Sequence, residues 1–262
     1  MNYSFIGKFK CKVNKNSSFF LYNNNFDLES NIFWVGLNNL EWEQKERMVW
    51  MKLSRFADNI LDIGSNTGVY SLISKVSNKK SNVIAFEPQP NIFNILTKNI
   101  QINKMNIKCI NKALSNFNGT AQFYNYGDKT FEDNSTTAGS LNKEWRPENQ
   151  HSIEVDVITL SNFIEENNIK NIDLIKMDVE TNEYEVLVGY GKYLYVHQPI
   201  ILLEIQNENI GKKIETLFDY NSYTFFHFLK SEEMQKINHL GISSNGHNYL
   251  ICPNSKLTSL DL

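Results

Sequence analysis

The fold of this chain is decided by the stretch Asn59-Ile60-Leu61-Asp62-Ile63-Gly64-Ser65-Asn66-Thr67-Gly68-Val69-Tyr70. Its apolar start is typical of a buried strand, and its two glycines are typical of a tight turn, because glycine adopts positive φ without strain. Apolar residues then follow at helical spacing. The stretch predicts strand, turn and helix, with backbone N–H groups at the start of the helix facing a ligand.

A second motif tells what kind of ligand to expect. The next apolar run, 82–86, is followed by Glu87. Glu87 lies 25 positions beyond Asp62. In a doubly wound sheet, that spacing puts the acid at the tip of the neighbouring strand, where it accepts hydrogen bonds from both ribose hydroxyls of a nucleoside. The two motifs together favour a nucleoside site over a turn that merely requires glycines.

Composition and charge exclude some classes of partner and limit the number of domains. The chain has 262 residues, a net charge of −3 and a pI of about 6.0, so it is long enough for one large domain and has no basic field for nucleic acid or anionic membrane. Its three cysteines are far apart and not at metal-ligand spacing, which suits a reducing compartment. Without a signal-like apolar segment or a long apolar run, we expect a soluble, cytoplasmic protein.

The flanks of the glycine motif are less regular. Residues 1–39 predict a hairpin-like N-terminal extension, followed by the main domain over 40–262. Glu43 lies early in a predicted amphipathic helix, where it either reaches a ligand over the mouth of the site or belongs to a solvated helix face. The polar stretch between 126 and 150 has little periodicity, as in a functional lid or a disordered loop.

Two further apolar runs end in acids. The run 172–177 is followed by Asp178 and Glu180, and the run 199–205 carries Glu204 near its end. Because ligands of open α/β sheets bind at the carboxyl ends of the strands, we expect these three carboxylates to converge there. The alternative is a solvated loop that carries ordinary acids.

Four motifs, taken together and in this order, resemble the FkbM family of S-adenosylmethionine-dependent methyltransferases. The resemblance runs from about residue 40 to 252 and rests on Asp62-Ile63-Gly64-Ser65-Asn66-Thr67-Gly68-Val69-Tyr70-Ser71, Ala85-Phe86-Glu87-Pro88, Asp173-Leu174-Ile175-Lys176-Met177-Asp178-Val179-Glu180 and Pro199-Ile200-Ile201-Leu202-Leu203-Glu204. It implies an α/β, Rossmann-like class I methyltransferase fold. The expected sheet is doubly wound and mostly parallel, with seven strands of which the last is antiparallel.

The resemblance also implies roles for individual residues. The methionine part of S-adenosylmethionine would be held by Asp62, Gly64, Asn66 and Gly68, the ribose by Glu87, and the adenine edge by Asn111 and Ala113. The same motifs add Ser65, Tyr70, Pro88 and Asp178 to the expected cofactor site. One residue departs from the family pattern. Members usually have glycine after Asp-Val-Glu, whereas this chain has Thr181, which puts the shape of the acceptor pocket in doubt.

The implied reaction is methyl transfer to an oxygen, commonly a hydroxyl of a sugar, a glycan or a natural product. Asp178, Glu180 and Glu204 are the candidates for removing or orienting the hydroxyl proton. The three acids could instead hold a divalent metal, but no histidine joins them in sequence, so we prefer the metal-free mechanism. The expected partner is a small-molecule or glycan acceptor, and the oligomeric state is open.

Two other classes of function share part of this pattern. A nicotinamide-dependent oxidoreductase has the same strand, turn and distal acid, but its fingerprint is G-x-G-x-x-G, and here Asn66 and Val69 stand at two of the glycine positions. A non-catalytic module would keep the fold and need none of the acids at the strand ends. The presence of all three favours an enzyme.

Overall fold

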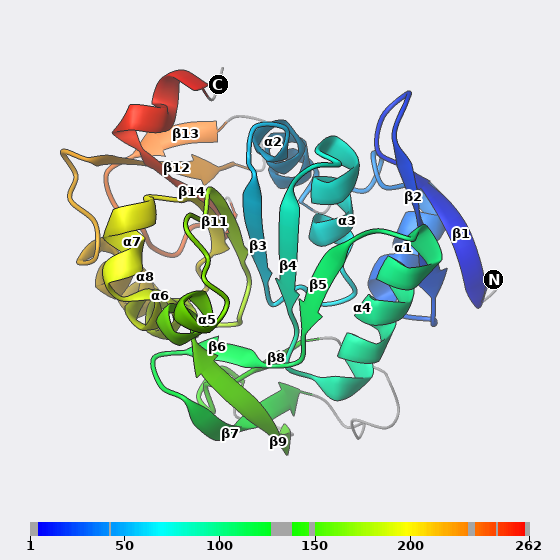
Figure 1. The fold of residues 1–262 in the computed structure, drawn as a ribbon, viewed down its shortest axis with the longest axis horizontal. Coiled ribbons are helices and arrows are strands. Elements are labelled where there is room, and N and C mark those ends of the chain that lie inside the picture. Colours follow the sequence, from blue (N-terminus) through cyan, green and yellow to red (C-terminus); the bar gives the residue numbers. More distant parts are fainter. Residues whose placement is uncertain are drawn as a thin grey trace.

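The structure of the chain, a computed structural model, describes residues 5–41, 43–126, 138–146, 150–229, 234–244 and 246–259. Its centre is an eight-stranded sheet covered by helices on both faces (Figure 1). In spatial order the strands are β13 (Met234–Ile237), β12 (Tyr223–Phe228), β14 (Asn248–Pro253), β11 (Ile200–Glu204), β10 (Leu174–Met177), β3 (Asn59–Ile63), β4 (Asn82–Phe86) and β5 (Ile107–Ile110).

The topology confirms the expected class I fold. The strands from β11 through β10, β3 and β4 to β5 are parallel, and β14, the last strand of the chain, runs antiparallel between β11 and β12. The sheet has one strand more than the expected seven, because the chain folds back after β12 and adds β13 as an antiparallel edge strand. Strands β10 and β11 are buried along almost their whole length, which is why they read as continuous apolar runs.

Each face of the sheet has its own hydrophobic core. One contains α2 (Gln44–Ser54), α3 (Val69–Ser77) and α4 (Pro90–Asn103). The other contains α5 (Leu160–Glu166), α6 (Glu183–Tyr190), α7 (Lys192–His197) and α8 (Glu208–Glu215). The 3₁₀ helix Asn254–Ser259 follows β14. In the described part of the chain, no helix combines the length and the hydropathy that a bilayer crossing requires.

The N-terminal segment packs into the first of these cores. Strands β1 (Gly7–Lys12) and β2 (Ser18–Asn23) form an antiparallel hairpin, which α1 (Asp27–Val35) follows. Phe19, Leu21 and Ile32 lie in the same cluster of buried side chains as Trp50 of α2. The boundary between residues 39 and 40 therefore lies inside one hydrophobic core, and the two-part division remains a prediction about folding units.

A second sheet lies beyond the carboxyl ends of the central strands (Figure 1). Its order is β6 (Ala113–Ser115), β9 (Gln150–Thr159), β7 (Gly119–Tyr126) and β8 (Gly139–Ser140). Residues 127–137 and 147–149 of the expected lid or disordered loop lie outside the described residues. The part of that stretch that is described supplies β8 and a turn that lies over the carboxyl edge of the central sheet.

At Gly64 the loop after β3 packs directly against the loop after β10. Its φ is +73°, and a Cβ atom built on it would lie 1.8 Å from the carbonyl oxygen of Asp178. The sequence predicted a tight turn at this glycine, and the structure shows that the group that comes close to it is the main chain of Asp178. Glycine is required here because the two loops touch.

This contact predicts a large effect of Gly64→Ala. Positive φ and overlap with a main-chain atom should together lower the free energy of unfolding by about 2–5 kcal/mol, measured by urea denaturation. Gly36→Ala is a control for positive φ without overlap, since Gly36 has φ of +84° and ψ of +146° and its nearest neighbour would be 3.7 Å from the new Cβ. Because this combination of φ and ψ is close to a region that is essentially restricted to glycine, the control should lose about 1–3 kcal/mol. Equal losses in the two variants would contradict the contact.

Candidate active site

A cavity of about 460 Å³ opens at the carboxyl ends of β3, β4, β10 and β11, within the size range of small-molecule sites. Most residues predicted for the site line it. They are Asp62, Gly64, Ser65, Asn66, Tyr70, Glu87, Pro88, Ala113, Asp178, Glu180 and Glu204.

Two predicted cofactor residues, Gly68 and Asn111, do not line this cavity. Gly68 packs against α4, where an added Cβ would lie 2.6 Å from Leu96 Cδ1. The side-chain amide of Asn111 donates to the carbonyl oxygens of Glu87 (2.8 Å) and Pro88 (3.0 Å). Both residues support the loops from behind, and their expected contact with the cofactor stays a prediction.

The glycine loop uses its own N–H groups. Those of Gly64 and Ser65 both donate to the carbonyl oxygen of Phe86, and that of Gly68 donates to the carbonyl oxygen of Ser65. The N–H of Asn66 donates to Glu87 Oε2 at 3.0 Å. These four N–H groups bind the second strand or close the turn itself, so they already have acceptors within the protein, and the expectation for the N–H groups at the start of α3 stays a prediction.

Glu87 is held in place by the same loop. Its Oε1 accepts from the N–H of Gln89 at 2.9 Å, and its side chain is buried. Burial raises the pKa of Glu87 to about 7, while the N–H groups of Gln89 and Asn66 oppose the shift. Each carboxylate oxygen keeps a second lone pair. Glu87 can therefore accept hydrogen bonds from a vicinal diol in addition to the two it already has.

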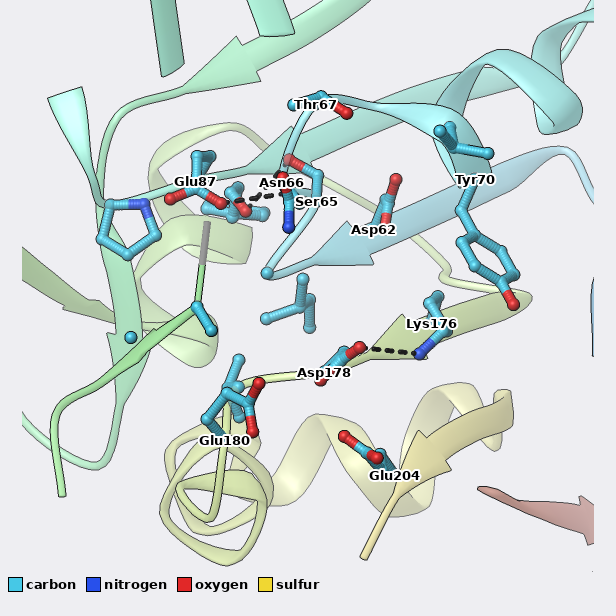
Figure 2. Close-up of a pocket in the computed structure, with 18 of the residues that line it drawn as sticks. Asp62, Ser65, Asn66, Thr67, Tyr70, Glu87, Lys176, Asp178, Glu180 and Glu204 are labelled. Carbon is cyan, nitrogen blue, oxygen red and sulfur yellow. Dashed lines mark hydrogen bonds and ion pairs between the residues drawn. The ribbon is translucent and has the colours of Figure 1, made fainter. Parts of the chain in front are cut away.

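The three predicted catalytic acids come together. Oxygens of Asp178, Glu180 and Glu204 lie within 4.8 Å of one another (Figure 2). Gln206, which sequence reasoning missed, donates to Glu180 Oε2 at 2.7 Å and to Glu204 Oε2 at 2.8 Å. Burial and the neighbouring carboxylates, above all Asp178, raise the pKa of Glu180 to about 8 and that of Glu204 to about 9. At neutral pH the carboxyl groups of Glu180 and Glu204 therefore keep their protons at this edge of the cavity.

A buried lysine faces the cluster. Lys176 lies 3.5 Å from Asp178 Oδ2 and 5.1 Å from the ring centre of Tyr70 (Figure 2). The hydroxyl of Tyr70 donates to Glu43 Oε2 at 2.8 Å, so Glu43 reaches the cavity, which is one of the two alternatives that the sequence left open. Sequence reasoning missed Lys176, although a charged residue inside an apolar strand was the signal that could have found it.

The loop that carries the acids is strained. Glu180 and Thr181 have φ of +53° and +74°, the left-handed region in which a β-branched residue is rare. A glycine at position 181, which the resemblance leads one to expect, would adopt this φ without strain. The threonine hydroxyl accepts from Asn142 Nδ2 at 2.9 Å, and Ser140 Oγ donates to the carbonyl oxygen of Glu180 at 2.6 Å. The substitution therefore attaches the acid loop to the segment after β8.

Helix α1 forms a wall that the sequence did not predict as part of the site. Asp27, Leu28 and Asn31 line the cavity, and the buried carboxyl of Glu29 accepts a hydrogen bond from Thr67 in the glycine loop. Burial raises the pKa of Glu29, which the Thr67 hydrogen bond opposes. The N-terminal segment thus contributes side chains to the wall of the cavity.

Comparisons with known proteins show which family and which relatives the chain resembles in sequence. The methyltransferase FkbM domain matches residues 62–240. The hexuronic acid methyltransferase AglP of Haloferax volcanii is 28% identical over 153 residues, covering 58% of this chain and 58% of AglP. The 31-O-demethyl-FK506 methyltransferase FkbM of Streptomyces tacrolimicus is 28% identical over 156 residues, covering 52% of this chain and 60% of that protein. The chain thus spans about three fifths of these two relatives.

A solved structure, that of a methyltransferase FkbM from Methylobacillus flagellatus, is also similar. It has a TM-score of 0.47 and 12% sequence identity, over 74% of this chain and 43% of that chain.

The raised pKa values predict how stability depends on pH. From the ordinary glutamate pKa of 4.5 up to about 9, the native state keeps a proton on Glu204 that the unfolded chain has lost. The free energy of unfolding therefore falls as the pH rises through this range. In thermal melts from pH 6 to 9, Glu204→Gln should show a shallower fall than the wild type. The exposed Glu165→Gln should keep the wild-type slope, and a wild-type slope in Glu204→Gln would contradict the buried, protonated carboxyl.

Proposed function

The chain belongs to the FkbM methyltransferase family, since the family's domain covers residues 62–240, and we propose that it methylates a hydroxyl oxygen of a sugar, a glycan or a natural product. The cofactor of this methyltransferase is S-adenosylmethionine. The observation that carries the proposal is the convergence of Asp178, Glu180 and Glu204 at one edge of the cavity. The names of the relatives add a hexuronic acid and a hydroxyl of a natural product as examples of acceptors.

The residues present in the cavity fit this cofactor. Glu87 offers lone pairs to a ribose diol, as argued above. Two buried polar atoms of cavity-lining residues, Asn66 Oδ1 and Lys176 Nζ, have no hydrogen-bond partner among the described residues. Because unpartnered buried polar groups are costly, one acceptor and one donor remain for a ligand to satisfy. Apolar side chains next to Glu87 and β6, among them Pro88 and Ala113, suit the faces of a purine.

The protein's part in the reaction is alignment and proton removal. When bound, the cofactor supplies an activated methyl group for an in-line displacement. Asp178 closes β10 and lies in the cavity beside the glycine loop, where it orients the acceptor hydroxyl. Glu180 and Glu204 share Gln206 and, because their pKa values are raised to about 8 and about 9, they help to orient the acceptor hydroxyl at neutral pH and take a proton only at higher pH. General-base help of this kind contributes about 100- to 10,000-fold to the rate.

Glu87→Ala tests the cofactor half of the proposal. Removing the carboxylate should weaken binding of S-adenosylhomocysteine, measured by calorimetry, by about 1.5–3 kcal/mol, the usual contribution of hydrogen bonds to a charged group. Asp156→Ala, on the exposed side of β9, should bind like the wild type. Unchanged affinity in a folded Glu87→Ala protein would rule out the ribose contact.

Amide variants of the three acids test the chemical half. Asp178→Asn, Glu180→Gln and Glu204→Gln keep the shape of the side chains but accept no proton, so turnover with a hydroxyl acceptor should fall by about 100-fold or more in the triple variant. The single and double variants show how the acids share the work, and Glu165→Gln is the control. Full activity in the triple variant would refute the carboxylate mechanism. A requirement of the wild type for magnesium or manganese would favour the metal-assisted alternative.

A further inference from the structure

Lys176 is a lysine inside a buried strand. All four residues of β10 are buried, and the Lys176 side chain is 2% exposed. In the parallel register it lies opposite Asp62 of β3 and Leu202 of β11, in the middle of the sheet. Lysine is almost never fully buried unless it is paired. A residue this costly to bury calls for a reason.

Its ion pair with Asp178 does not use all of its hydrogen-bonding capacity. An ammonium has three N–H donors, and the 3.5 Å separation from Asp178 Oδ2 is long for a hydrogen bond. Nζ has no hydrogen-bond partner within the described ranges. Burial on its own would lower the pKa of Lys176, but the carboxylates of Asp178, Glu43, Glu204 and Asp62 outweigh burial and the net pKa is raised. The side chain stays a cation with unused donors.

The electrostatic character of the cavity makes this cation distinctive. The acids that line it are Asp27, Glu43, Asp62, Glu87, Asp178, Glu180 and Glu204. Among the described cavity-lining residues, the other lysine is Lys112, whose side chain is 40% exposed and pairs with Asp156 at 3.5 Å. Lys176 is therefore the buried positive charge in a strongly acidic cavity.

The methionine end of the cofactor carries groups of both signs. Its sulfonium and its ammonium are cations, which an acidic wall attracts, whereas its carboxylate is an anion, which the same wall repels. The N–H groups of Gly64, Ser65, Asn66 and Gly68 already have acceptors within the protein. An anionic group in this cavity needs a donor that the loop does not provide at these positions.

We propose that Lys176 binds the carboxylate of the methionine part of S-adenosylmethionine, an inference that rests on the proposed function. Lys176 lies beside Asp62, which is near the end of β3. The glycine loop that follows β3 lines the same cavity as Lys176. The carboxylate satisfies the unused donors of Nζ, and the surrounding acids are left to attract the sulfonium and the ammonium. The ion pair with Asp178 keeps the ammonium head in the cavity.

Calorimetry with two ligands isolates this contact. One ligand is S-adenosylhomocysteine, and the other is its decarboxylated analogue, which keeps the amine, the thioether and the adenosine. Wild-type protein should prefer S-adenosylhomocysteine by about 10- to 100-fold, the range of a charge-assisted hydrogen bond. In Lys176→Met that preference should disappear. Affinity for the analogue should stay the same or rise, because a positive charge has left the cavity.

Two further variants serve as controls. Lys112→Met removes the more exposed cavity lysine and should keep the wild-type preference. Lys176→Met/Asp178→Asn removes both members of the ion pair at once, so it leaves neither member without the other and measures the same preference if the single variant does not fold.

The outcomes separate the two proposals. An equal loss of affinity for both ligands in Lys176→Met, or an unchanged preference together with a raised KM for the acceptor, would overturn the carboxylate contact and leave the methyltransferase proposal standing. Failure of the wild-type protein to bind either ligand would instead contradict the cofactor site itself.

Discussion

The contact between Gly64 and the main chain of Asp178 is the constraint on which the site depends. Parallel neighbours β3 and β10 end at the same level, so the loops that follow them must turn away side by side. The lack of a Cβ at Gly64 lets them touch. The glycine loop thereby determines where Asp178 lies, and it also donates to Phe86 and Glu87 at the end of β4. This one packing contact thus fixes the position of the expected catalytic acids relative to the residues expected to bind the cofactor.

Charge is the second organising influence. Several carboxylates gathered in one cavity repel each other and lose hydration, which is why the pKa values of Glu180 and Glu204 are raised. Lys176 supplies a compensating charge from inside the sheet, next to Asp178. A cavity with this balance attracts a cationic ligand as a whole while keeping one place for an anionic group. That description matches a sulfonium amino acid better than a dinucleotide, whose diphosphate is anionic.

Helix α1 and the segment after β8, which lie outside the central sheet, also help to form the site. Helix α1 lines the cavity and its Glu29 accepts from Thr67, while the segment after β8 is attached to the acid loop through Asn142 and Thr181. Both attachments join segments that are far apart in the sequence. The left-handed backbone at Glu180 and Thr181 stores strain at the place where the acids must be aimed, a common location for strain in functional sites.

The sequence by itself determined the central fold and the strand-end acids, because buried parallel strands read as apolar runs and the residues after them must meet at one edge. It predicted Glu87, Asp178, Glu180 and Glu204 for that reason alone. Only the tertiary structure decided what depends on contacts between distant segments. Gly68 and Asn111 turned out to brace the loops, since their neighbours Leu96, Glu87 and Pro88 come from other elements. Likewise the roles of Lys176, Gln206 and Glu29 follow from side-chain partners that no local periodicity encodes.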